Sequence, residues 1–567
     1  MSRYGHGSCA RPRWRRGVVL VALLGVAAAA CGDDNGSSPA GTDTSSAAIS
    51  TTVAPQRGGT LTVGLFAELK SLDSVMNQGA GSAGGGNELG ALYDRLLEWD
   101  PVANKYNPKT AESVTPNDDL TAWTIKLRPN IKFGDGTAYD AAAVKVHLER
   151  SKNPPAGSTG LAGALASISR VEVVDPLTVR IVLTEPWAQF PFMLTMTPGM
   201  VMSPTAVQKL GNDINTKPVG AGAGPFEFVS FKPGEGVVLK RNENYWNGEV
   251  YLDQLRFVTL AGGPATYQAL KTGNIDVAFL RDAASIAQSK ADHFAGSDTV
   301  YSSGGLILVN NGVEVTCKDQ QPAPACAGKA DGAKAIPKTP GQDLRVRQAI
   351  ALALDVDVIN QRLTEGTGLP ARSLFDQSFP WDPKVADPKV DLDRAKKLVQ
   401  EAKAAGWDGK IRLLCSNTVV PVGLAVEAML KSVGMDVDTT KTNVEVLSSV
   451  ADVITKKDFD VACWGYQLSP DDYGQVGLDL NLRSTSSGNR VGYKSAAMDA
   501  ALIELKKARS DDAKKAVFKK IADLWVSDVP SVPYSHATDR LLWGAKVHGA
   551  RTTSQASGVY DKVWLER

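Results

Sequence analysis

Residues 123–137 read WTIKLRPNIKFGDGT, and this stretch bears most directly on the fold. From Trp123 to Leu127 apolar and polar residues alternate, which predicts a strand with one buried face. Asp135-Gly136 supplies the residue types of a tight turn. The apolar spacing over 141–151 then predicts a helix. The stretch therefore predicts a strand, a turn and a helix in direct succession.

Hydrophobic patterns outside this stretch predict further elements. Strands are expected at 60–65, 306–309, 411–415 and 459–464, a hairpin over 226–239, and helices at 87–99, 344–362, 421–433, 495–509 and 511–528. The first half is richer in strands and turns. In the second half helices and strands alternate, which indicates α/β layers with substantial parallel pairing.

The N-terminus has the pattern of an export signal. A basic cluster at 11–16 precedes an apolar run, 17–30, that is too short for a membrane span. Small residues then lead directly to Cys31, which is similar to a bacterial lipobox, although Ala28 stands where Leu is usual. We expect 1–30 to be a signal peptide and Cys31 to carry a lipid; an ordinary cleavable signal is the alternative. Arg15-Arg16 also occurs in twin-arginine signals, but ordinary secretion is preferred.

Composition describes the rest of the chain in outline. Residues 31–57 are rich in small and polar residues without apolar periodicity, so we expect a flexible tether. A chain of 567 residues is too long for one core, which predicts two or three lobes. A net charge of +1 argues against a nucleic-acid partner. No later apolar run is long enough to span a membrane, so we expect attachment to the extracytoplasmic face of the membrane through the lipid anchor only.

Cysteines are few. Cys317 and Cys326 lie close together in a polar stretch, and outside the cytoplasm we expect them to form a disulfide. Cys415 and Cys463 each lie in a short apolar run and are interpreted as buried small hydrophobes, with their pairing left open. The Cys and His residues show no metal-ligand spacing, so we expect neither a metal nor a cofactor.

Motifs in a consistent order along the mature chain resemble those of the bacterial extracellular solute-binding proteins of family 5. This is the peptide- and nickel-binding group of ABC-importer components. Residues 123–137 match its most diagnostic region. The other matching motifs are RGGTL (57–61), SLD (71–73), LYDRLL (92–97), PKTAES (108–113), GAGPF (222–226), LKRNENYW (239–246), KTGNID (271–276), DLRVRQAIALALD (343–355), residues 489–499 and DVPSVPY (528–534). Gly222 and Gly224 are expected to permit a tight backbone course.

The resemblance implies an α/β periplasmic-binding-protein type II fold, with two hinged lobes and an additional N-terminal subdomain. Lobe I is expected to comprise 58–98, 206–303 and 536–567, the additional subdomain 99–205, and lobe II 304–535. The implied mechanism is capture of a peptide or similar small polar solute, closure of the lobes, and delivery to the importer's permease subunits. We expect a monomer that is not an enzyme.

The resemblance also implies where the ligand lies. In peptide-binding members, a buried strand leads to a Trp, followed three residues later by an Asp that pairs with the peptide's N-terminal amine. Trp464 stands at the first position, but Gln467 stands at the second, and a neutral amide cannot supply a charge-assisted bond. Asp471 or Asp472 is a candidate substitute. Tyr466, like Trp464, suits stacking on a ring or packing on an aliphatic chain.

Other candidate ligand contacts come from separate segments. The Gly-rich loop over 77–87 lies where the family lines its cleft. The candidates are Gln78 and Asn87 in that loop, Gly304, Gly305 and Leu306 at the crossover to lobe II, and Arg372, which would meet an anionic group.

Three alternatives stay open or are excluded. The neutral Gln467 leaves room for a sugar or another non-peptide organic solute. A secreted hydrolase would need paired carboxylates or a nucleophile with a base. Asp471 and Asp472 are adjacent and expected to splay apart, and the sequence has no nucleophile elbow on a strand-turn-helix, so this class is disfavoured. A sensory receptor with the same fold is not separated from a transport component by sequence.

Overall fold

The computed structural model describes residues 54–567, except 78, 80–84, 159, 323, 324 and 387. The signal peptide, the tether up to Val53, Cys31 and Gln78 therefore lie outside the described residues. Internal contacts join Pro55–Arg567 into one compact unit.

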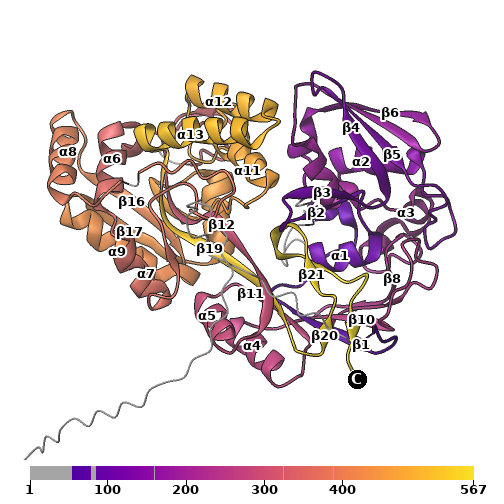
Figure 1. Ribbon diagram of the computed structural model, residues 1–567. Helices are drawn as coiled ribbons and strands as arrows, with labels where there is room; N and C mark the ends of the chain where they lie inside the picture. The colour runs from indigo at the N-terminus through magenta and orange to yellow at the C-terminus, as the bar shows by residue number, and fades with distance from the viewer. Residues whose placement is uncertain (1–53, 78, 80–84, 159, 323–324, 387) are drawn as a thin grey trace, which may run out of the picture. The chain divides into compact units, whose positions relative to one another are not determined.

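One long mixed sheet organises this unit (Figure 1). Among the described residues it has eleven strands, in the order β17-β16-β18-β12-β19-β11-β1-β10-β9-β8, with β15 beside β19. Their bounds are β1 Thr60–Leu65, β8 Phe226–Lys232, β9 Gly236–Arg241, β10 Gln254–Thr259, β11 Val277–Leu280, β12 Ala295–Val309, β15 Leu369–Pro370, β16 Lys410–Ser416, β17 Asp436–Val444, β18 Val461–Trp464 and β19 Ser531–Trp543. β16 runs parallel to β17 and β18, and β1 runs parallel to β10 and β11.

The strands β12 and β19 tie the two ends of this sheet together. They pair antiparallel from Ala295↔Trp543 to Leu308↔Ser531. The β11 side holds one end of this pair, and β18 pairs with the last residues of β12. Both chain crossings between the ranges expected for lobes I and II therefore run through these two strands.

Helices cover both faces of the sheet around β16 and β18. Side chains alternate there, with Ile307 and Leu413 in one core and Leu306 and Leu414 in the other. Figure 1 shows α6–α9 on one side and α11–α13 on the other. Their bounds are α6 Leu344–Ala353, α7 Val356–Thr364, α8 Leu392–Ala404, α9 Val420–Ser432, α10 Val446–Val450, α11 Asp472–Leu482, α12 Ala496–Lys507 and α13 Asp511–Asp528, with a π-helical turn at Ala451–Lys456.

Two predicted helices were wrong in extent. The helix expected over 344–362 is two helices, because the Asp355 side chain accepts from the amides of Asp357 and Val358 and so starts α7. The helix expected over 87–99 is α1, Gly86–Tyr93, which ends at Asp94 with φ 58°. Strand pairing then takes over: β2, Leu97–Asp100, pairs with β3, Lys105–Pro108.

Residues 99–205 carry a separate antiparallel sheet. Within the described residues its order is β4-β5-β7-β6. Its elements are β4 Ala111–Pro116, β5 Ala122–Leu127, β6 Ile168–Asp175, β7 Thr178–Leu183 and α2 Ala141–Lys152. The strand, turn and helix predicted from 123–137 and 141–151 are confirmed.

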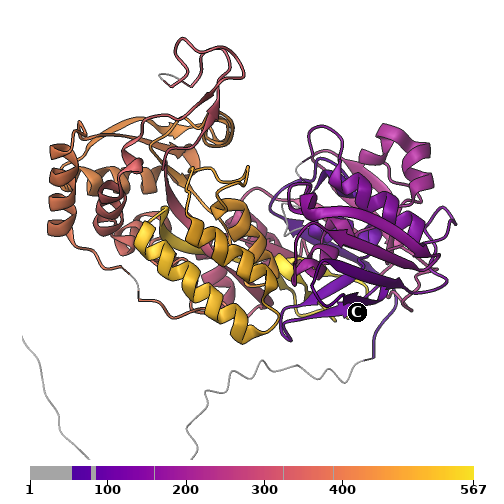
Figure 2. The same cartoon turned by 90° about the horizontal axis from the view of Figure 1, so that it is seen from above.

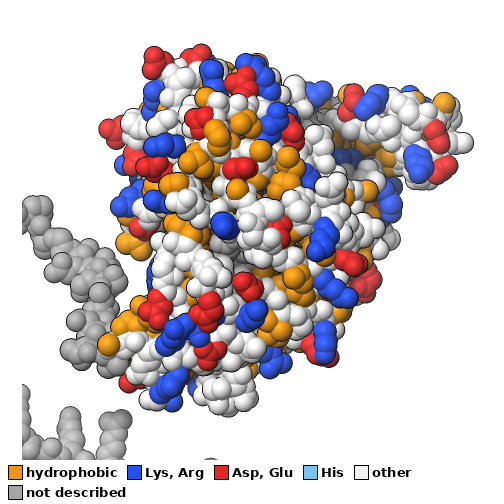
Figure 3. Space-filling view, turned by 90° about the vertical axis from the view of Figure 1, so that its right-hand side faces the viewer, with side chains coloured by type: hydrophobic (Ala, Val, Ile, Leu, Met, Phe, Trp, Pro, Cys, Tyr) orange, Lys and Arg blue, Asp and Glu red, His pale blue; other side chains and the backbone are white. Residues whose placement is uncertain are grey.

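The face drawn in Figure 3 mixes basic and acidic side chains, which fits the small net charge.

Glycines join the segment after this sheet's strand β5 to residues 220–222. The amides of Gly134 and Asp135 donate to the carbonyls of Gly222 and Gly220. A Cβ on Gly222 would lie 2.0 Å from the Leu92 carbonyl oxygen. The tight backbone course expected at Gly222 is therefore confirmed.

The remaining elements are short. The strand pairs are β2-β3, β13-β14, β20-β23 and β21-β22. Their bounds, with the remaining helices, are β13 Val315–Thr316, β14 Lys334–Ala335, β20 Val547–His548, β21 Arg551–Thr552, β22 Gly558–Val559, β23 Trp564–Leu565, α3 Pro204–Leu210, α4 Gly263–Lys271 and α5 Ala283–Ala291. A membrane-spanning helix is not found among the described residues.

The described residues contain two disulfides. Cys317 and Cys326 are joined, in the segment around β13 and β14 that projects at the top of Figure 2. Cys415 and Cys463 are also joined, between the parallel strands β16 and β18. The sequence left the pairing of these two cysteines open, and the structure shows that they pair. Both are buried as expected, but strand pairing brings together two thiols that are 48 positions apart in the chain.

Candidate ligand-binding site

The β12–β19 pair has a built-in irregularity. Register shifts interrupt the ladder between Tyr301 and Leu306. Ser303 in this bulge has φ 50°, and its amide donates to His536 Nδ1 at 3.1 Å. Burial lowers the pKa of His536, in keeping with a neutral ring that accepts this bond. A bulge bends a strand and locally disrupts its pairing, so the regular ladder between β12 and β19 is interrupted at this point.

The crossover candidates occupy this bulge. A Cβ on Gly304 would lie 2.3 Å from the Ala537 Cβ, and one on Gly305 would lie 2.4 Å from the Tyr534 ring. Leu306 is fully buried in the core. Strand packing alone thus explains these three residue types.

The segment after β18 turns away from the sheet. Trp464 is half-buried, with the Arg490 guanidinium 5.4 Å from its ring centre. The Tyr466 ring lies edge-on to Trp525 at 6.1 Å, which is core packing. Gln467 is exposed and has φ 51°. Of these candidates, Gln467 has the side chain most accessible to a ligand.

Positive charge near Trp464 was not predicted. Arg490 donates to Asn481 Oδ1 at 3.0 Å, and burial lowers its pKa. Burial and the nearby Arg490 lower the pKa of Lys457 to about 8. Arg490 lies inside a matched motif, but about 25 positions separate it from Trp464, and no periodicity links the two.

The adjacent carboxylates Asp471 and Asp472 point to different partners. Asp471 accepts from the Tyr473 amide at 3.0 Å and from the Ser469 hydroxyl, and so caps α11. Burial raises its pKa to about 7. Asp472 Oδ1 lies 2.6 Å from Lys514 Nζ, and its Oδ2 accepts from the Tyr106 hydroxyl at 2.5 Å. Both carboxylates are thus already engaged within the protein.

Tyr106 belongs to the range of the additional subdomain, so Asp472 joins two parts of the molecule. A larger set of bonds lies near it and is called the interlobe contact here. It consists of Glu185, Ala188 and Gln189 on one side and Leu505, Lys506 and Ala508 on the other.

The interlobe contact combines charge with backbone bonds. Lys506 Nζ lies 2.5 Å from Glu185 and 3.2 Å from Asp479. The Ala188 amide donates to the Lys506 carbonyl at 2.7 Å. Gln189 Nε2 donates to the carbonyls of Leu505 and Ala508. Residues 99–205 thus contact α12 and the residue that follows it directly, and these bonds do not involve β12 or β19.

Asn87 lies in α1, in a different part of the fold from the residues after β18. It is fully buried, and its Oδ1 accepts from the Gly558 amide and the Tyr560 hydroxyl, each at 2.8 Å. Within the described residues its Nδ2 has no partner, and the same holds for Gln555 Nε2 and Ser557 Oγ. A Cβ on Gly86 would lie 2.2 Å from Ser557 Oγ, so these segments touch.

Arg372 lies apart from the residues after β18. Its Nη1 donates to the Leu354 carbonyl at 2.6 Å, and its Nη2 lies 3.9 Å from Asp355. It lines a largely apolar pocket together with Trp525 and Val529. Arg372 therefore bridges the α6–α7 corner.

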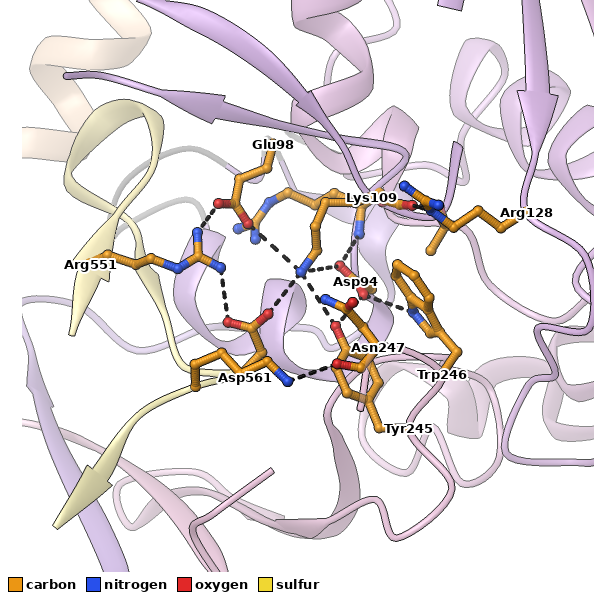
Figure 4. Close-up of polar contacts among 12 residues, drawn as sticks. Asp94, Glu98, Lys109, Arg128, Tyr245, Trp246, Asn247, Arg551 and Asp561 are labelled. Atoms are coloured by element: carbon orange, nitrogen blue, oxygen red, sulfur yellow. Dashed lines mark hydrogen bonds and ion pairs between the residues drawn. The ribbon is translucent and has the colours of Figure 1, made fainter. Parts of the chain in front are cut away.

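A buried ion network fixes the C-terminal segment (Figure 4). Lys109 Nζ lies 3.0 Å from Asp561, 3.6 Å from Asp94 and 3.8 Å from Glu98. Arg551 pairs with Asp561 at 2.9 Å and also with Glu98. The network joins the end of α1, β2 and the residues before β4 to 551–561. It thereby positions the segment that contains Ser557 and that contacts Asn87.

A second unpredicted arginine lies near the bulge. Arg281, which follows β11, makes two bonds of 2.7 Å to Asp539. Its guanidinium lies 5.1 Å from the ring centre of Phe66, which is 46% exposed.

Within the described residues no group of three or more His, Cys, Asp or Glu side chains is arranged to hold a metal ion.

Comparison with known proteins accounts for this architecture. The model of the bacterial extracellular solute-binding proteins, family 5 (middle), matches residues 105–489, well over half of the chain. The chain belongs to this family. The resemblance drawn from the sequence motifs is confirmed. The family consists of binding proteins, which agrees with the expectation of a non-enzyme.

Two solved structures and one curated relative illustrate the similarity. The glutathione-binding protein GsiB of Escherichia coli O1:K1 is 28% identical over 293 residues, covering 52% of this chain and 52% of GsiB. The matched stretch thus spans about half the length of that relative. DppA from Helicobacter pylori in complex with peptide STSA is 22% identical, with TM-score 0.71 over 90% of this chain and 99% of DppA.

The second structure is a substrate-binding protein from Microbacterium hydrocarbonoxydans complexed with 4-hydroxybenzoate hydrazide. It is 18% identical, with TM-score 0.65 over 89% of this chain and 100% of that protein. These likenesses confirm the periplasmic-binding-protein type II fold.

Proposed function

We propose that this protein is the extracytoplasmic substrate-binding lipoprotein of an ABC importer. It captures a peptide or similar small polar solute between two lobes and delivers it to the membrane permease. The observation that carries the proposal is the long β12–β19 pair, with its bulge between Tyr301 and Leu306. The bulge offers a hinge between the two ends of the sheet. Residues 99–205 and lobe II also contact each other directly through the interlobe contact.

The proposed lobes follow the ranges drawn from sequence. Lobe I comprises 58–98, 206–303 and 536–567, the additional subdomain 99–205, and lobe II 304–535. The separate apolar cores support this division, because one core draws on 96–201 with Ala223, and two others are built around β16 and β18. The proposed ligand contacts are Gln467, Trp464 and Asn87, with Gln78 outside the described residues.

The ligand class is supported by the relatives. GsiB is named as a glutathione-binding protein and DppA was solved with peptide STSA, so a peptide is favoured. The Microbacterium protein was solved with 4-hydroxybenzoate hydrazide, which supports a non-peptide organic solute as the alternative. Gln467 lacks the charge to anchor a terminal amine, and the positive Arg490 beside Trp464 suits an anionic group on either kind of ligand.

The decisive experiment identifies what the protein holds. The full-length protein is purified from its native membrane, denatured, and the released small molecules are identified by mass spectrometry. Bound peptides support the proposal, and a bound sugar moves the assignment to the alternative. An empty protein that also fails to bind a peptide library by calorimetry would refute capture.

The anchor and the partner are tested separately. Replacing Cys31 with Ser should release the protein into the medium, and continued membrane retention would count against lipidation. Deleting the gene should abolish uptake of the identified solute. Normal uptake together with a lost transcriptional response would favour the sensory receptor.

A further inference from the structure

One side chain in α11 is buried without hydrogen-bond partners. Gln475 is 3% exposed. Its donor Nε2 and its acceptor Oε1 are both buried, and neither has a hydrogen-bond partner. No other side-chain amide in the part of the chain that the structure describes has both its donor and its acceptor in this state. Buried polar groups in folded proteins nearly always have partners, because desolvation without a new bond costs free energy. This glutamine therefore calls for an explanation.

Its position on the helix places it beside the junction of the lobes. Residues three and four apart share a helix face, so Asp472, Gln475 and Asp479 lie along one side of α11. Asp472 bonds to Tyr106, and Asp479 lies 3.2 Å from Lys506, which reaches Glu185. Both neighbours thus mark the side that meets the additional subdomain.

Apolar contacts from the same helix agree with this placement. The Tyr473 ring stacks on Phe192 at 5.9 Å, and Tyr473 and Val476 pack on the core of the additional subdomain. Gln475 is therefore buried close to the face of α11 that packs on the additional subdomain. Across the same junction, Gln189 Nε2 donates hydrogen bonds within the interlobe contact. Its Oε1 has no hydrogen-bond partner among the described residues.

We infer that Gln475 contacts the ligand and that the group it recognises is the backbone of a peptide. The inference rests on the proposed function and names the substrate class of that site. In an extended peptide, the N–H and C=O of one residue point to the same side, as they do in hydrogen-bonded pairs of antiparallel strands. A carboxamide presents one acceptor and a donor to match them. The pairing needs no charge, so it is compatible with the absence of an acid at Gln467.

The inference explains why an unpaired amide is retained. A residue kept for binding is not optimised for the stability of the unliganded fold. Removing its polar atoms should therefore stabilise the empty protein and weaken binding. A glutamine with a structural partner would behave in the opposite way on stability.

The test compares wild type with Gln475→Met, which keeps a similar length without hydrogen-bonding atoms, and with Gln475→Glu, which keeps the acceptor and loses the donor. Gln400→Leu, at an exposed position on α8, is the matched control. Occupancy by co-purified molecules is read by native mass spectrometry. Binding of the tetrapeptide STSA and of reduced glutathione is read by calorimetry after the proteins are stripped in guanidinium and refolded.

We expect Gln475→Met to lower peptide occupancy and affinity at least about tenfold, the loss that follows when a partner group is left unpaired. The stripped variant should melt about 1–3 °C higher than stripped wild type. Gln475→Glu should also lose affinity, and Gln400→Leu should match wild type in both assays.

The two failures are distinguishable. Wild type with no bound or binding small molecule would sink the proposed function together with this inference. Wild type that holds a peptide equally well in Gln475→Met and Gln475→Glu overturns the inference alone, as does a bound sugar. A stripped Gln475→Met that melts lower than wild type shows a structural role and also overturns it.

Discussion

The interlobe contact predicts that one charge controls opening of the lobes. Glu185→Gln keeps the shape of the side chain and removes its charge toward Lys506 and toward Arg483, whose Nη1 lies 3.6 Å from Glu185. Lys506 is 10% exposed and keeps Asp479 at 3.2 Å, so no buried charge is left alone. The substitution therefore acts mainly on the bond across the junction, not on the fold of either side.

The size of the effect follows from burial and distance. A hydrogen bond to a charged group is worth about 1.5–3 kcal/mol, and an exposed ion pair about 0–1 kcal/mol. Glu185 is 33% exposed, which places this pair between those cases. We expect a loss of about 1–2 kcal/mol in the free energy of closure, or about 5- to 30-fold more opening.

Hydrogen exchange reads this opening at a single bond. The Ala188 amide donates across the junction to the Lys506 carbonyl at 2.7 Å. Its exchange should accelerate about 5- to 30-fold in Glu185→Gln. The Thr184 amide donates to Ser167 at 2.8 Å within the subdomain and should not change. Glu172→Gln is the matched control, because Glu172 is 35% exposed and pairs with Arg170 on its own strand.

Two results would refute this reasoning. Unchanged exchange at Ala188 would mean that Glu185 does not hold the lobes together. Equal acceleration at Thr184 would mean that the subdomain itself has loosened, so that closure was not being measured.

Three further predictions concern stability. Burial raises the Asp471 pKa from 3.8 to about 7, so between about pH 4 and 7 the folded protein holds a proton that the unfolded chain has lost. The free energy of unfolding therefore falls as the pH rises through this range. Melting temperatures of Asp471→Asn, measured across the same pH range, should lack this contribution to the decrease. Removing the Cys415–Cys463 disulfide, which closes a separation of 48 residues, should cost about 4 kcal/mol in guanidinium unfolding, more than loss of the short-range disulfide; an equal cost would contradict this loop-length argument. Gly222→Ala places a Cβ 2.0 Å from a backbone carbonyl and should cost at least about 1–3 kcal/mol, which an unchanged melting temperature would disprove.

Local elements were predictable because burial periodicity is written in neighbouring residues. The strand at 60–65, the helix at 511–528 and the turn at Asp135-Gly136 are confirmed. Errors arose where a single residue ends an element. Asp355 caps α7 inside a continuous amphipathic pattern, and Asp94 ends α1 before a run that pairs as a strand. In each case the local pattern was right and the boundary was set by a cap or by a distant partner.

The candidate site divides in the same way. The sequence singled out Gln467 and Trp464 because a family motif surrounds them, but Asp471 and Asp472 looked free until α11 and its neighbours supplied their partners. The sequence carried no indication of Arg490 beside Trp464 or of the buried Gln475, because nothing within a few residues of either position marks such a contact or such burial.

By itself, the sequence determined the family, the α/β class and most of the elements, since the ordered motifs and apolar spacings are local properties. The stretch WTIKLRPNIKFGDGT was enough to place a strand and a turn, and the apolar spacing over 141–151 placed the helix that follows. Only the tertiary structure decided that Cys415 meets Cys463, that Lys506 grips Glu185 and that Gln475 is buried without a partner. Those facts depend on which surfaces come together from segments far apart in the chain, and the spacing of residues in one segment does not encode its partner in another.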